Sequence, residues 1–267
     1  MKKLIISADI EGTCGIAHWD EANRTKSDYA YFVDQMTREV AAAAQGAIDG
    51  GMDEVLVKDG HGSARNINPR MLPRETRMFR GWACHPYSMM FGIDGGFDGC
   101  AFTGYHSAAS INCNPLSHTM NGGNNFVKIN GEIASELMIN CLTAAYNGVP
   151  VYFVAGDKGL CEWIQSVNPN ISVVATNEGF GNGTFAIHPD VALEQIHDVM
   201  QQAVSTHTRE ECMFPMPEHF TVEINFKDVY RARVGGFYPG CEQVDSRTVR
   251  YECDDWFDVL RFFSFVL

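Results

Sequence analysis

The sequence predicts an α/β protein: a mostly parallel sheet flanked by helices, followed by a smaller α+β domain. Within residues 1–187, short apolar runs alternate with amphipathic segments of helical length, which is typical of parallel βαβ units. From residue 188 onward, a helical segment is followed by a proline-rich break and two segments of alternating polarity, which indicate half-buried strands. We therefore predict two domains, 1–187 and 188–267.

The first domain contains five apolar runs that we expect to be strands, at residues 4–8, 54–58, 99–103, 149–155 and 171–175. A helix is predicted over 29–50, because apolar residues such as Met36 and Val40 recur at helical spacing and Gly50-Gly51 stops the pattern. A second helix is predicted over 131–145, with Asn130 as its N-cap.

The second domain is predicted to begin with a helix over 189–207. Strands are expected at 220–226 and 248–252, and a final helix from residue 254 onward. This last segment is aromatic on nearly every side, so we expect it to be buried or to form a subunit contact.

Composition excludes several classes of function. The chain has 267 residues, is 45% hydrophobic and carries a formal net charge of −13. An ordinary folded protein is expected, and the acidic balance argues against a nucleic-acid partner. No apolar run is long enough for a membrane span or a signal peptide, and the nine cysteines include no Cys-x-x-Cys pair. We therefore expect a soluble cytoplasmic protein with reduced thiols and no membrane partner.

Acidic and imidazole side chains follow three of the predicted strands. Asp9 and Glu11 come after the first strand, Asp59 and His61 after the second, and His106 after the third. In an open parallel sheet, the carboxyl ends of the strands form the ligand-binding edge. Both pairs are spaced two residues apart, so their members point to the same side of an extended backbone.

A helix contributes a further carboxylate. Glu136 lies on the inward face of the predicted 131–145 helix, beside Leu137. An inward glutamate is costly unless it is paired or binds a metal ion. Any one of these residues alone is more commonly a loop or capping residue, so the interpretation depends on their shared location.

The charges of this set favour two metal ions. Three carboxylates in one crevice repel one another, and one divalent cation leaves a negative excess. Two divalent cations leave a positive excess that a bound hydroxide neutralises. Mixed imidazole and carboxylate ligands suit zinc, although manganese and iron are also compatible. Five ligands fit two metals that share a carboxylate and a water, and we predict Asp9 as the bridging ligand.

Several ordered motifs carry a family resemblance. They are Ser7-Ala8-Asp9-Ile10-Glu11-Gly12, Val57-Lys58-Asp59-Gly60-His61, Gly104-Tyr105-His106, Leu116-Ser117-His118-Thr119-Met120, Asn130-Gly131-Glu132-Ile133-Ala134-Ser135-Glu136-Leu137 and Ala155-Gly156-Asp157. In this order, over roughly the first 190 residues, the chain resembles the binuclear zinc D-aminopeptidases of the DppA type, the dipeptide transport protein family.

The resemblance implies roles for particular residues. It implies that Asp9, Glu11, His61, His106 and Glu136 bind two Zn²⁺ ions per chain, and that His118 is a catalytic residue close to the metals. It also implies a short peptide substrate from which an N-terminal residue, preferably a D-amino acid, is removed, and a homo-oligomer that is a decamer of two pentamers.

One stretch departs from the family pattern. Residues 174–190 contain no Lys or Arg and carry alternating glycines instead. We expect the glycine-bearing run at 177–183 to form a flexible loop over the crevice, and the lack of basic residues leaves the substrate preference open.

The predicted reaction is metal-assisted amide hydrolysis by a hydroxide that bridges the two ions. His118 is expected to stabilise the oxyanion or to protonate the leaving amine, and Asp59 to orient the His61 imidazole. Two alternatives remain: another two-metal amidohydrolase or phosphoesterase, and a non-catalytic peptide-binding module that holds metal only structurally.

Overall fold

The first sheet confirms the predicted parallel α/β architecture. A computed structural model describes all 267 residues. The strands of this sheet are β1 (Lys3–Ala8), β2 (Glu54–Asp59), β3 (Thr76–Phe79), β4 (Gly99–Tyr105), β7 (Val151–Asp157), β8 (Ser172–Phe180) and β9 (Gly183–Ala186). Their order is β3-β2-β1-β4-β7-β8-β9, and only the β8–β9 pair is antiparallel.

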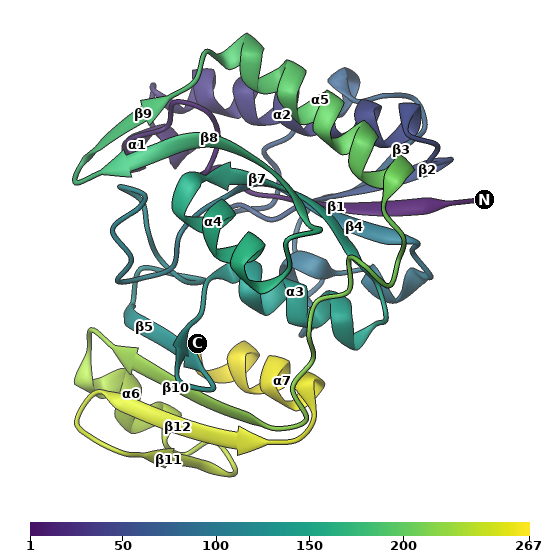
Figure 1. Cartoon of the computed structure of the whole chain (residues 1–267). Helices are drawn as coiled ribbons and strands as arrows, with labels where there is room; N and C mark the ends of the chain where they lie inside the picture. The colour runs from purple at the N-terminus through teal and green to yellow at the C-terminus, as the bar shows by residue number, and fades with distance from the viewer.

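Helices cover both faces of this sheet (Figure 1). They are α1 (Trp19–Ala22), α2 (Tyr29–Asp49), α3 (Glu136–Tyr146), α4 (Lys158–Val167) and α5 (Pro189–Thr206). Leu4 and Ile6 of β1 share a hydrophobic cluster with α2 and α5, whereas Ile5 shares one with α3 and α4. Successive side chains of a strand point to opposite faces, so β1 is buried on both sides, as its uninterrupted apolar run predicts.

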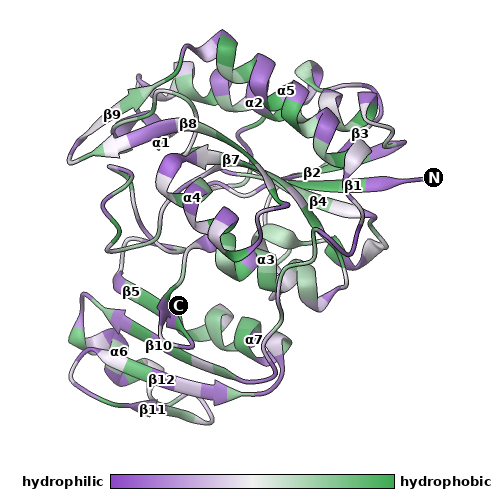
Figure 2. Ribbon diagram, in the orientation of Figure 1, coloured by the Kyte–Doolittle hydropathy of each residue, from purple (hydrophilic) through white to green (hydrophobic).

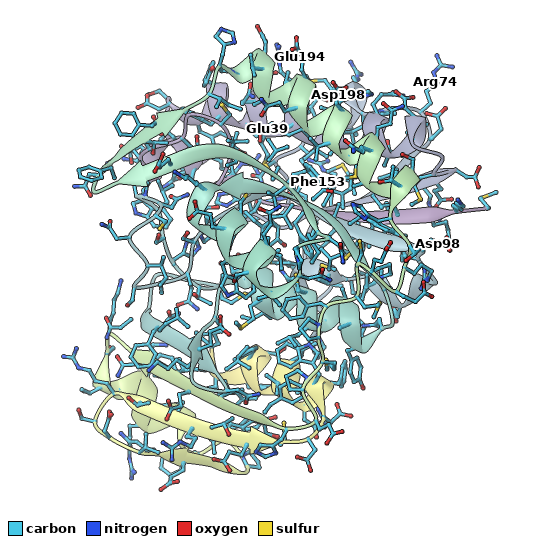
Figure 3. All side chains as sticks on the ribbon, viewed as in Figure 1. Glu39, Arg74, Asp98, Phe153, Glu194 and Asp198 are labelled. Atoms are coloured by element: carbon cyan, nitrogen blue, oxygen red, sulfur yellow. The ribbon has the colours of Figure 1, made fainter.

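The polarity of α5 follows from its position at the surface. Its inner face buries Ile196 and Met200. Figure 2 shows hydrophilic colour on the outward turns of this helix, and Figure 3 shows Glu194 and Asp198 on its outer side, while Phe153 lies within the sheet. The helix therefore belongs to the layer that covers the first sheet.

A second, antiparallel sheet forms the smaller unit. Its strands are β5 (Asn124–Ile129), β6 (Glu132–Ile133), β10 (Phe220–Phe226), β11 (Cys241–Gln243) and β12 (Thr248–Cys253), and it carries α6 (Val229–Gly235) and α7 (Trp256–Val266). The order is β11-β12-β10-β5-β6. Because β5 and β6 come from the first 187 residues and α5 packs against α2, the division between the sheets does not coincide with a boundary at 187/188.

One hydrophobic core joins the two sheets. Phe102 of β4, Leu137 of α3, Val222 of β10 and Trp256 of α7 belong to the same buried cluster. The second sheet and α7 are thus packed onto the face of the first sheet that α3 covers. Their positions are fixed relative to the carboxyl ends of β1 and β4.

The predicted helix over 131–145 starts later than expected. Asn130 and Gly131 both have positive φ and form the turn between β5 and β6, as Asn-Gly pairs do in tight hairpins. Ser135 is the N-cap, since its side chain accepts a hydrogen bond from the Met138 N–H. Glu136 is consequently the first helical residue of α3.

Residues 177–186 form a hairpin, where a flexible loop was expected over 177–183. β8 and β9 pair over Asn177–Phe180 and Gly183–Ala186. Asn177 is buried, and its side-chain amide binds the Gly15 N–H and the Thr13 carbonyl, each at 2.7 Å. This strand therefore holds the loop that follows Glu11.

No helix combines the length and the apolar character that a membrane crossing needs. All nine cysteines are free thiols.

A buried acid on α2 makes the fold sensitive to pH. Glu39 is 1% exposed and accepts hydrogen bonds from the Cys14 N–H and the Gln35 side chain, while its Oε2 has no partner. Burial raises the pKa of Glu39 to about 7. Since the unfolded carboxyl ionises near its ordinary value, the folded state loses stability as pH rises from about 4.5 to about 7.

We predict that Glu39→Gln removes this loss, which amounts to about 3 kcal/mol across that pH range. Denaturant unfolding at a series of pH values, at constant metal content, measures it. Asp34→Asn, at an exposed position of the same helix, serves as the control and should leave the pH profile of the parent unchanged. Parallel profiles for Glu39→Gln and the parent would contradict the prediction.

Candidate metal centre

The acidic and imidazole residues converge where β1, β2 and β4, which are neighbours in the first sheet, end. The chain closes on itself tightly at this edge. A Cβ on Gly12 would lie 1.9 Å from the Tyr105 carbonyl oxygen, and one on Gly104, which has a φ of 68°, would lie 2.1 Å from that of Asp9. Only glycine permits these approaches, and they bring the loops after β1 and β4 together.

Asp9 lies between two groups of possible metal ligands. Its Oδ1 is 3.3 Å from His61 Nδ1, which is itself 3.0 Å from Glu11 Oε2. Its Oδ2 is 3.6 Å from His106 Nε2, which is 3.7 Å from Glu136 Oε1. The two oxygens of one carboxylate thus face different groups, which is the arrangement that a bridging ligand requires.

His118 completes the second group. Its Nε2 is 3.5 Å from Glu136 Oε1, and its ring stacks on His106 at a centroid distance of 4.3 Å. The ligand atoms of His106, His118 and Glu136 lie within 4.8 Å of one another, as do those of Asp9, Glu11 and His61. The structure therefore brings all five predicted ligands and the predicted catalytic histidine together.

Backbone carbonyls fix the orientation of all three imidazoles. His61 Nε2 is 2.8 Å from the Ala22 oxygen, His106 Nδ1 is 2.9 Å from that of Ser107, and His118 Nδ1 is 2.9 Å from that of Leu116. A carbonyl only accepts, so these nitrogens carry the hydrogen. The other nitrogen of each ring faces the carboxylates, which is where a cation would bind.

Burial and close charges shift the pKa values of this cluster strongly. Asp9, Glu11, His106 and Glu136 are each at most 3% exposed. Burial, with the Glu11 charge added to it, raises the pKa of Asp9 well above its usual range. For Glu11, burial is outweighed by the neighbouring His61 imidazolium, which holds the pKa of Glu11 well below its usual range.

The pKa values of His61 and His106 are both raised. Burial by itself lowers a histidine pKa, but Glu11 and Asp9 raise that of His61 to about 12. Glu136, followed by Glu11 and Asp9, raises the pKa of His106 to about 9. In the absence of metal ions, protons on the His61 and His106 rings therefore balance part of the negative charge of the carboxylates.

The donor set fits divalent cations. Glu11 Oε2 and His106 Nε2 are buried and make no hydrogen bond of acceptable geometry, although Glu11 Oε2 is in ion-pair contact with His61. Unpartnered buried polar atoms are rare in folded proteins. Together with oxygen and imidazole donors in two compact groups, they fit zinc or a similar transition metal.

Asp59 acts on the backbone of the His61 loop. Its carboxylate accepts hydrogen bonds from the Asn66 N–H, the Asn66 side chain and the Ile67 N–H. Asn66 in turn donates to the His61 carbonyl at 2.8 Å. The acceptor for the His61 ring is the Ala22 carbonyl, so Asp59 shapes the loop that carries this histidine.

Three further buried residues support the ligands. Asp157, at the end of β7, accepts hydrogen bonds from the backbone and hydroxyl of Ser107, directly after His106. Asn114 donates to the same carboxylate and to the Glu11 carbonyl. Asp157 follows a strand just as Asp9 does, so the strand-end rule could have identified it. No sequence signal marks Asn114.

The cluster lines an open cavity of about 350 Å³. Trp82, Met89 and Met120 form its less polar walls. The Met120 N–H donates to Glu136 Oε1 at 2.7 Å and holds that carboxylate in place. A second hollow, lined by Asn23, Arg24 and Asn66, adjoins the cavity at Glu11 and His61. A small molecule thus has access to the ligand cluster.

The chain is similar over most of its length to characterised D-aminopeptidases. A curated D-aminopeptidase from Bacillus subtilis (strain 168) is 28% identical over 255 residues, which are 95% of this chain and 92% of the relative. The solved structure of the Zn-dependent D-aminopeptidase DppA from Bacillus subtilis, described as a self-compartmentalizing protease, superposes with a TM-score of 0.90 at 26% identity and covers 99% of this chain and 96% of that one.

The model of the M55 peptidase family, described as D-aminopeptidase, matches residues 1–265. This match includes every residue of the ligand cluster and both sheets. The chain belongs to the M55 family of D-aminopeptidases.

Proposed function

We propose that this protein is a zinc-dependent aminopeptidase that removes an N-terminal residue, a D-amino acid, from short peptides. The observation that carries the proposal is the position of Asp9, whose two carboxylate oxygens face separate groups of buried ligands. This arrangement suits two cations that share one carboxylate. The similarity to a Zn-dependent D-aminopeptidase supports the choice of metal and substrate.

Five residues are proposed to hold two zinc ions. Glu11 and His61 serve one ion, His106 and Glu136 the other, and Asp9 serves both. Bound zinc supplies Lewis acidity, which polarises a scissile carbonyl and lowers the pKa of a water molecule. The carbonyl contacts to His61 and His106 hold the ligating nitrogens in position before a metal arrives.

His118 is proposed as the proton-transferring residue. Its Nδ1–H is committed to the Leu116 carbonyl, so its Nε2 is the atom that faces the cavity. Trp19 packs edge-on against the ring at a centroid distance of 5.2 Å, which together with the stacked His106 limits its rotation. An imidazole held in this way can take up at Nε2 a proton from the attacking water and pass it to the leaving amine of a cleaved peptide.

The wider setting of the enzyme is also proposed from the relatives and the composition. The self-compartmentalizing architecture of the related protease supports a homo-oligomer here, for which we propose a decamer. Exposed apolar residues on two regions, Phe180 and Phe185 on the β8–β9 hairpin and Phe237 and Phe265 near α6 and α7, offer contact surfaces. Nine free cysteines support a cytoplasmic location.

For the proposed function, the first prediction concerns metal content and turnover. The parent should contain about two zinc ions per chain and hydrolyse D-alanyl peptides. His61→Ala and His106→Ala should each lose about one ion, Asp9→Asn should lower occupancy of both sites, and all three should lose turnover. Elemental analysis and peptide assays measure this.

L-alanyl peptides and a phosphate monoester serve as comparison substrates. Faster turnover of the phosphate ester would support a phosphoesterase instead. Loss of the fold on zinc removal, in a protein that hydrolyses none of these substrates, would support a structural metal site.

The second prediction concerns protons. Because the pKa values of His61 and His106 are raised to about 12 and about 9 in the metal-free protein, both rings are protonated at pH 7. Zinc binding should therefore release about two protons per chain from these rings, in addition to the proton of the Asp9 carboxyl wherever its raised pKa keeps it bound. Calorimetry in buffers of different ionisation enthalpy measures the number, and His61→Ala should lower it by about one. Zinc binding without proton release would contradict the ligand assignment.

The third prediction separates catalysis from metal binding. His118→Ala should lower kcat by about 10²–10⁴-fold while zinc content stays at the parent value. His118→Gln, which retains a polar side chain, should be equally slow, because an amide cannot transfer a proton at neutral pH. Loss of zinc in both variants would make His118 a ligand instead.

A further inference from the structure

A further cavity, separate from the hollow at Asn23 and Arg24, adjoins the metal cavity, and its character is different. It has a volume of about 200 Å³ and lies between α3, α7 and the segments around residues 86–88 and 120–121. Met120, Ile139, Leu260 and Phe263 form its apolar walls, and no Asp, Glu, Lys, Arg or His side chain lines it. The charged metal cavity thus opens beside an apolar one.

The two cavities share a boundary. Ser88 and Met120 line both of them. Along α3, Glu136 faces the metal cavity, while Ile139 and Asn140 face the apolar one. One helical turn advances about 5 Å along the axis. The apolar cavity therefore begins about one turn of α3 from Glu136, a distance that a single residue of a bound peptide can span.

Both boundary residues have a strained backbone. Ser88 has a φ of 45° and Met120 a φ of 64°, values in the left-handed region that non-glycine residues rarely adopt. Strain of this kind persists where the surrounding structure enforces it, and it concentrates at ligand-binding sites. Here it occurs at both residues that separate the cavities, and the Met120 N–H is tied to Glu136.

Most polar groups in the apolar cavity are already engaged with the protein. The Asn140 amide donates to the Tyr105 hydroxyl, the Asn121 amide to the Leu267 backbone oxygen, and the Ser264 hydroxyl to the Leu260 carbonyl. A polar or charged ligand would therefore find few free partners. An apolar group needs none, and cavities of roughly 150 Å³ lined by aliphatic and aromatic side chains bind benzene.

We propose that this cavity is a specificity pocket that binds an apolar side chain, of leucine or phenylalanine size, from the peptide residue next to the scissile bond. The inference rests on the proposed peptidase function and adds its substrate class. It also gives the second unit a role, because α7 supplies Leu260, Phe263 and Ser264 to a pocket that adjoins ligands held by the first sheet.

The test uses Ser264→Leu, which fills the cavity from an exposed position of α7, with Ser264→Ala as the matched control that removes only the hydroxyl. One substrate series varies the second residue (D-Ala-Gly, D-Ala-D-Leu, D-Ala-D-Phe), and the other varies the first (D-Leu-Gly, D-Phe-Gly). In one of the two series, Ser264→Leu should lower kcat/KM for the Leu and Phe peptides about tenfold or more, with D-Ala-Gly unchanged. That series identifies which side of the scissile bond the pocket serves.

Leu260→Ala should act in the opposite sense by enlarging the pocket, so that kcat/KM for the Phe peptide rises relative to the Leu peptide. An equal effect of Ser264→Leu on every substrate, or none on any, would overturn the proposal.

A binding experiment separates the pocket from the chemistry. Calorimetry with D-Ala-D-Phe and D-Phe-Gly in a His118→Ala background should show weaker binding of one of them when Ser264→Leu is added, but not when Ser264→Ala is added. If this binding pattern is found but the parent protein cleaves no peptide, the pocket is supported and the peptidase function is overturned. Unchanged affinity, or no binding of either peptide, would overturn the pocket.

Discussion

The site depends on how closely the chain can approach itself where β1 and β4 end. At Gly12 and Gly104 the backbone of one loop lies against a carbonyl of the other, at distances that leave no space for a side chain. This contact brings Asp9 and Glu11 from one strand next to His106 from another. The β2 loop and the start of α3 then add His61 and Glu136. The ligand cluster is a consequence of this close contact between backbones.

Concentrating so many ionisable groups in a buried place creates an electrostatic problem. Without cations, burial raises the pKa of Asp9, the neighbouring His61 charge lowers that of Glu11, and the surrounding carboxylates raise those of His61 and His106. Divalent cations at the same place would satisfy Glu11 Oε2 and His106 Nε2, which have no hydrogen-bond partner. The cost of burying the acids would therefore be the physical reason for metal binding at this site.

Sequence patterns predicted the parts of this structure that follow local rules. The apolar runs and helical periods identified β1, β2, β4, β7, β8, β10 and β12, together with α2, α5 and α7. The strand-end rule identified four of the clustered residues. Short elements such as β3, β6 and β11 were missed, because two to four residues carry too little periodicity to indicate a strand.

Non-local features could not be predicted from the sequence. The start of α3 was placed too early because Asn130-Gly131 was interpreted as a helix cap rather than a hairpin turn. The pairing of β5 with β10 depends on packing between segments about ninety residues apart, as in Ile129 opposite Val222. His118 was assigned by resemblance alone, and Asn114 and the strained Met120 carry no local signal. These positions are defined only when the two sheets share a core.

The carbonyl contacts to the three imidazoles have a consequence for how such a site can change over time. Ala22, Ser107 and Leu116 contribute main-chain oxygens, which every amino acid possesses. Replacing any of these side chains leaves the ring tautomers unaltered as long as the path of the backbone is kept. The orientation of the three rings is thus insulated from side-chain replacements at these three positions.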